Sequence, residues 1–129
     1  MNKQELQRRT KQFALRVFKL VDALPRTPAG RAVANQLVRS ATSVGANYRA
    51  ACRARSRAEF TAKLGTVLEE ADESLYWLEL IREGRLIPES KLSLLLIEAD
   101  ELTAILTAGR KSAAGNTSNI KHRTSYIAS

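Results

Sequence analysis

The residues of this chain whose types and spacing could do chemistry are arginines gathered at one point. Arg49, Arg53, Arg55 and Arg57 occur close together in the stretch SVGANYRAACRARSRAEF, Ser43 to Phe60. Guanidinium groups can bind phosphate oxygens, and they can equally pair with carboxylates of a neighbouring helix. On a helix, these positions fan around the end rather than lining one stripe. The cluster therefore indicates either an anion-binding surface or a set of internal ion pairs.

Other reactive side chains are scarce. The single cysteine, Cys52, stands among small residues with no ordered histidine to activate it, which is typical of a small buried hydrophobe. The single histidine, His122, lies in the polar C-terminal stretch. The carboxylates of EEADE, Glu69 to Glu73, therefore lack the imidazole partner that a di-iron site in a bundle needs. We expect no metal, no cofactor, no catalytic residue and no enzymatic activity.

Asn47 is the remaining polar residue of interest, because it falls on an apolar stripe of its helix. A buried amide must find hydrogen-bond partners. Its usual role in such a place is to fix the packing register, as polar core positions do in coiled coils. We therefore expect Asn47 to be a structural polar residue of the core.

The charge of the chain is divided along its length. The net charge is +8, but the first 57 residues hold thirteen basic and two acidic residues, and residues 58–109 hold four basic and eleven acidic ones. A basic half can bind nucleic-acid phosphates. It can also pair with the acidic half of its own chain or of a neighbouring subunit. The sequence leaves both possibilities open.

Four helical segments must position these residues. Apolar residues recur at helical spacing in about 3–24, 28–54, 57–83 and 88–113, and few residues alternate as in strands. Thr27-Pro28 and the capping box from Ser56 to Glu59 mark helix starts, and Gly84 stands where a C′ glycine belongs. The sequence predicts an all-α, antiparallel up-down-up-down four-helix bundle over residues 1–114. Residues 115–129 are predicted to be a disordered basic tail.

Apolar residues off the core stripes suggest that the bundle associates with itself. Extra apolar positions on the first, second and fourth helices exceed what a four-helix core needs, and an exposed apolar patch usually marks an interface. No stretch is apolar enough for a secretory signal or a membrane span. We expect a cytoplasmic homo-oligomer without a membrane partner.

This sequence resembles the bacterial four helix bundle protein family in the order and spacing of several residues. Members of that family are also called 23S rRNA intervening-sequence proteins. The resemblance covers about residues 6–108. It rests on the second helix, QLVRSATSVGANY, and on a spaced set of residues: Ser43, Asn47, Arg55, Ser56, Glu59, Phe60 and the EEADES stretch from Glu69 to Ser74.

This resemblance implies a ring of four-helix bundles, commonly a pentamer. It extends to the accessory protein of diversity-generating retroelements, a basic pentamer that engages a reverse transcriptase and nucleic acid. Many members carry Ala-Glu-Gly where this chain has Arg49-Ala50-Ala51, so this segment is more basic here. For most of the family no biochemical function is established.

Two functions follow as expectations. The first is a non-enzymatic, oligomeric accessory or adaptor protein that binds the backbone of RNA or DNA through Arg49, Arg53, Arg55 and Arg57. The second is a homo-oligomeric protein-interaction scaffold with no nucleic-acid role, in which the basic half of one copy faces the acidic half of the next.

Overall fold

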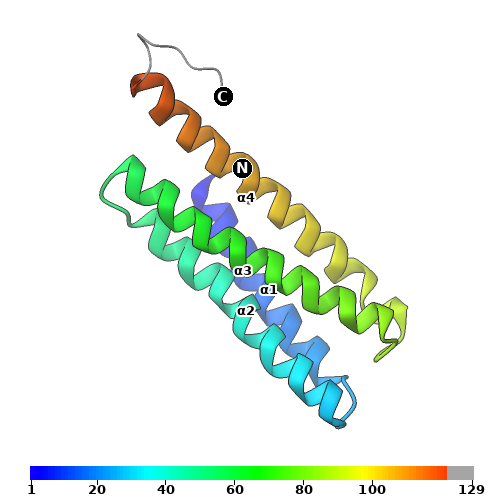
Figure 1. The fold of residues 1–129 in the computed structure, drawn as a ribbon. Coiled ribbons are helices and arrows are strands. Elements are labelled where there is room, and N and C mark those ends of the chain that lie inside the picture. The colour runs from blue at the N-terminus through cyan, green and yellow to red at the C-terminus, as the bar shows by residue number, and fades with distance from the viewer. Residues whose placement is uncertain (122–129) are drawn as a thin grey trace.

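The fold is an antiparallel bundle of four long helices (Figure 1). The computed structural model describes residues 1–121, and it describes the side chains of residues 1–115. The helices are α1 (Lys3–Asp22), α2 (Pro28–Cys52), α3 (Arg57–Glu83) and α4 (Ser93–Lys121), with a short 3₁₀ turn, η1 (Glu89–Lys91), before α4. Each helix packs against the next along the chain, and α1 also contacts α4. The predicted fold class is confirmed.

Side-chain caps fix where three helices begin. The side chains of Asn2, Thr27 and Ser56 accept hydrogen bonds from backbone N–H groups three residues further on, at 2.8, 3.1 and 3.0 Å. Glu59 Oε1 accepts from the Arg55 backbone N–H at 2.8 Å, so the α2–α3 turn is held from both sides. The helix starts predicted at Pro28 and after Ser56 are therefore observed.

The core is built from the stripes that the sequence predicts. Large side chains from all four helices are fully buried: Phe13, Val17, Leu37, Val44, Leu64, Val67, Leu78, Ile81, Leu102 and Leu106. Among residues 1–115, the buried polar side chains are Thr10, Ser40 and Ser74. The hydroxyls of Ser40 and Ser74 are hydrogen-bonded at 2.9 Å across α2 and α3. The hydroxyls of Thr10, Ser40 and Ser74 each have a hydrogen-bond partner, which offsets the cost of their removal from water. The buried Thr61 Oγ1, in contrast, has no partner among the described residues.

The ends of α3 and α4 differ from the sequence prediction. Gly84 is right-handed, with φ −80°, and Arg85 takes the left-handed conformation with φ 52°. The prediction that Gly84 is the C′ residue is wrong, because Gly84 is the C-cap and Arg85 occupies the left-handed C′ position. Pro88 precedes η1 rather than opening α4, which begins at Ser93. The predicted disordered tail begins at 115, but α4 continues to Lys121. Residues 122–129 lie outside the described residues, and there the prediction of disorder stays a prediction.

Candidate nucleic-acid interface

The four arginines of the predicted site lie at the end of the bundle where α2 turns into α3. Arg49 is in the last turn of α2, Arg53 caps it, Arg55 is in the turn, and Arg57 begins α3. All four side chains are exposed, and none of them forms an ion pair with a described residue. The alternative that they pair with acids of the next helix is therefore not observed in the described part of the chain. They are free to meet an external anion.

Internal charge pairing uses other arginines. Arg9 of α1 donates two hydrogen bonds of 2.8 Å to the Glu98 carboxylate of α4, and it also contacts Glu101. The bonds to Glu98 and then Glu101 raise the pKa of the Arg9 guanidinium above its ordinary value. The basic first helix thus pairs with carboxylates of α4, on the side of α1 that faces α4.

A second internal pair joins α2 to α3. Arg39 donates to Glu73 and lies 3.5 Å from Glu70. Trp77 Nε1 donates to the same Glu73 carboxylate at 3.1 Å. These hydrogen bonds, the one from Arg39 first, lower the pKa of the Glu73 carboxyl below its ordinary value of 4.5. Both sets of ion pairs join a basic residue from the first half of the chain to carboxylates from the second half.

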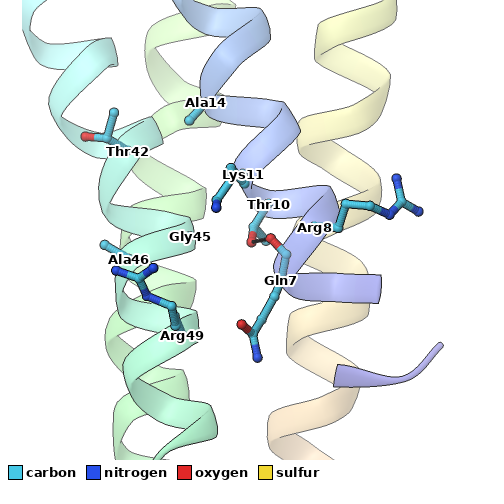
Figure 2. Close-up of a pocket in the computed structure, with 9 residues that line it drawn as sticks. All are labelled: Gln7, Arg8, Thr10, Lys11, Ala14, Thr42, Gly45, Ala46 and Arg49. Atoms are coloured by element: carbon cyan, nitrogen blue, oxygen red, sulfur yellow. Dashed lines mark hydrogen bonds between the residues drawn. The ribbon is translucent and has the colours of Figure 1, made fainter. Parts of the chain in front are cut away.

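Arg49 belongs to a groove between α1 and α2, which we call the α1–α2 groove. Its volume is about 420 Å³, and it is lined by Gln7, Arg8, Thr10, Lys11, Ala14, Thr42, Gly45, Ala46 and Arg49 (Figure 2). Lys11 and Arg49 lie on its two sides, whereas the Arg8 guanidinium points away from α2. α1 and α2 lie close together at Gly45. A Cβ added to Gly45 would lie 3.4 Å from Thr10 Oγ1 on α1. No acidic residue lines this groove.

Arg55 and Arg57 belong to a different hollow, which we call the tip cavity. It has a volume of about 520 Å³ and is lined by Lys3, Ala51, Cys52, Ala54, Arg55, Ser56, Arg57, Phe60, Gly109, Ser112 and Ala113. The Lys3 ammonium lies 4.6 Å from the centroid of the Phe60 ring, within the range of a cation–π contact. As in the groove, none of the lining residues is acidic.

The structure therefore divides the predicted cluster. Arg55 and Arg57 share the tip cavity, Arg49 lines the α1–α2 groove, and Arg53 lines neither. Sequence reasoning missed Lys3, Arg8 and Lys11 of α1, which line these hollows. Their only signal is that they lie off the buried face of α1, a property they share with other exposed cations.

Asn47 is placed differently from the expectation. Its side chain is half-buried rather than buried, and its Nδ2 donates to the Ser43 carbonyl of its own helix at 2.8 Å. The polar contact across α2 and α3 is instead made by Ser40 and Ser74. That Asn47 sets the packing register stays a prediction.

The remaining reactive residues form no metal-binding cluster among the described residues. Cys52 is half-buried, and burial together with the neighbouring thiol raises the pKa of the Tyr48 hydroxyl. Within residues 1–121, no group of three or more histidine, cysteine, aspartate or glutamate residues could hold a metal ion. In the same region, none of the helices combines the length and the apolar character of a membrane span. His122 lies outside the described residues.

Comparison with known proteins identifies the family of this chain. The model of the 23S rRNA-intervening sequence protein family matches residues 2–108. The chain belongs to this family. The resemblance on which the sequence analysis relied is therefore confirmed.

A solved structure of a protein described as a member of the S23 ribosomal protein family supports the fold. It is the crystal structure of a Bacteroides thetaiotaomicron protein of unknown function, with 33% sequence identity and a TM-score of 0.75. The match covers 82% of this chain and 98% of the Bacteroides chain. Comparison with curated protein sequences finds no match. The family thus fixes the architecture and leaves the biochemical role open.

Proposed function

We propose that this protein is a non-enzymatic, homo-oligomeric bundle that binds the phosphate backbone of RNA or DNA in the cytoplasm as an accessory or adaptor protein. The observation that carries the proposal is the set of exposed arginines at the α2–α3 end, none of which is neutralised by a described carboxylate. Lys3, Arg8 and Lys11 add positive charge from α1. Unneutralised cations at this density attract polyanions and release their counterions.

The surroundings of the arginines favour backbone contacts over base recognition. Tyr48 is buried, and the Phe60 ring is half-buried beneath the Lys3 ammonium. Neither ring offers the open stacking platform that single-strand binders use. Binding should therefore be strongly salt-dependent and only weakly dependent on sequence.

The test is a titration of labelled RNA and DNA at several salt concentrations. We compare the wild type with a variant in which Arg49, Arg53, Arg55 and Arg57 are all alanine. If each contacts one phosphate of a single strand, the slope of log K against log salt should become shallower by up to about 3. A matched control replaces four exposed, unpaired cations towards the other end of the bundle: Arg16, Lys19, Arg26 and Arg31.

The control has the same net charge as the test variant, so a specific site predicts a much larger loss for the test variant. Equal losses would show that only total charge matters. Absence of binding by the wild type at low salt would refute the proposal.

Self-association is supported by an exposed apolar stripe on α4. Leu94 and Ile97 are 69% and 59% exposed, and Ala104 and Ala108 follow on the same face at heptad spacing, with Glu101 between the two pairs. Such a seam is typical of helices that pack on a partner. Changing Leu94 and Ile97 to glutamate should lower the mass measured by light scattering. Tyr76→Glu on α3, which also replaces an exposed large side chain, is the matched control.

The scaffold function is the second candidate, and the Arg9 and Arg39 ion pairs favour it. They show that cations of the basic helices α1 and α2 do meet carboxylates of α4 and α3. A scaffold predicts an oligomer that high salt dissociates and an affinity for RNA that is negligible at any salt. An oligomer that resists salt and binds RNA tightly would exclude it.

A further inference from the structure

The tip cavity differs from the rest of the basic surface because its cations come from separate segments of the chain. Lys3 arrives from the start of α1, Arg55 from the turn after α2, and Arg57 from the first residue of α3. Their side chains line one hollow of about 520 Å³, with Ser112 of α4 on another wall. Three cationic side chains thus border one hollow, whereas the arginines on α2 are spread along a helix.

Neutralisation within the cavity is slight. The nearest acid along the chain, Glu59, does not line the hollow, and its Oε1 is occupied by the Arg55 backbone N–H. The Ser112 hydroxyl has no hydrogen-bond partner among the described residues. The Ser56 hydroxyl accepts from the Glu59 N–H at 3.0 Å, and its own hydrogen can still be donated. The start of α3 adds the positive end of a long helix.

This combination matches a phosphomonoester better than an internal phosphodiester. A diester in the middle of a strand carries one negative charge, whereas a terminal phosphate carries nearly two at neutral pH and one more free oxygen. Two or three cations together with hydroxyl donors can satisfy the second charge and the additional oxygen. A site that binds only internal phosphodiesters gains little from several cations in one hollow, because each phosphodiester carries a single negative charge.

We infer that the tip cavity binds the terminal phosphate of a nucleic-acid strand, while Arg49 and the α1–α2 groove contact the internal backbone. This inference rests on the proposed function, because it assigns the end of the bound strand to one part of the same surface. It makes Lys3, Arg55 and Arg57 the residues that distinguish a phosphorylated end from a hydroxyl end.

The experiment compares one short single-stranded RNA sequence in three forms: with a 5′-phosphate, with a 3′-phosphate, and with hydroxyls at both ends. The full chain should bind one of the phosphorylated forms about tenfold more tightly than the hydroxyl form, which is the effect of one additional charge-assisted contact. The variant Arg55→Ala/Arg57→Ala should bind all three forms equally. Arg49→Ala should weaken all three by the same factor and leave the preference intact.

Two further measurements keep the result unambiguous. Circular dichroism checks that the double variant is folded, and Lys3→Gln, which leaves the α2–α3 turn untouched, should also reduce the preference. A nucleoside monophosphate added as competitor separates a strand end from a free nucleotide as the ligand. If the monophosphate binds as tightly as the phosphorylated RNA, the strand contributes nothing and the inference is overturned.

The remaining outcomes separate this inference from the proposed function. Tight binding of all three RNA forms with no preference refutes the terminal-phosphate site and leaves backbone binding standing. Absence of binding by any form refutes the proposed function, and this inference fails with it.

Discussion

Gly30 offers a stringent test of the bundle's geometry. It is the third residue of α2, where the chain has just turned back from α1. A Cβ at this position would lie 2.0 Å from the Pro25 carbonyl oxygen and 3.0 Å from its carbonyl carbon. Both atoms are backbone, so no side-chain rotation can relieve the overlap. The substitution Gly30→Ala must move either the α1–α2 turn or the first turn of α2.

The expected cost can be worked from opposing contributions. Alanine in place of glycine in a helix gains about 1 kcal/mol. Displacement of the turn strains the packing of the buried Leu24, at about 1–3 kcal/mol, and weakens the Thr27 cap, at about 1 kcal/mol. The net effect is a destabilisation of roughly 1–3 kcal/mol. At roughly 4 °C per kcal/mol for a chain of this size, Tm should fall by about 4–12 °C.

The assay is urea and thermal unfolding followed by far-UV circular dichroism at one protein concentration, because self-association would shift the apparent stability. Gly109→Ala is the matched control. Gly109 is exposed within α4, and a Cβ there meets nothing within 4 Å. The control should therefore gain about 1 kcal/mol. A Gly30→Ala protein at least as stable as the wild type would show that the turn does not approach α2 in this way.

Three further predictions concern stability. Arg85→Gly should stabilise by about 1 kcal/mol in urea unfolding, because glycine adopts a φ of 52° without strain, and Arg85→Ala should give no such gain. Ser40→Ala and Ser74→Ala should each cost about 1 kcal/mol, and the double variant should cost less than their sum; strict additivity would mean that the hydroxyls do not interact. The lowered pKa of Glu73 adds stability above pH 4.5 that is lost as the pH falls through the folded-state pKa, so Glu73→Gln should weaken the acid-induced drop in Tm. An unchanged acid profile for Glu73→Gln would contradict this assignment.

Much of the fold could be predicted because its determinants are local. The spacing of Phe13 and Val17 on α1, or of Leu64, Val67 and Leu78 on α3, places them on one face of a helix before any tertiary contact is known. All of these side chains are buried in the bundle. Caps at Thr27 and Ser56 act within three residues, so they too could be identified in the sequence.

Local rules were less reliable at helix ends and at polar core positions. Gly84 and Arg85 compete for the left-handed position, and the sequence pattern favours the glycine although the structure uses the arginine. Asn47 lies on the same predicted stripe as Ser40, yet Asn47 is half-buried whereas Ser40 is fully buried. Which positions of a stripe are fully covered depends on how the neighbouring helices pack.

For the candidate site, the sequence alone determined that Arg49, Arg53, Arg55 and Arg57 lie at one end of the bundle, because they occupy a helix end and the turn that follows it. Only the tertiary structure decided which cations act together. Residues about 40 positions apart, such as Lys11 and Arg49, share a groove because α1 and α2 run antiparallel, and Lys3 reaches the tip cavity for the same reason. It also decided which arginines are neutralised, since Arg9 and Arg39 meet carboxylates of α4 and α3 that no local pattern could assign to them.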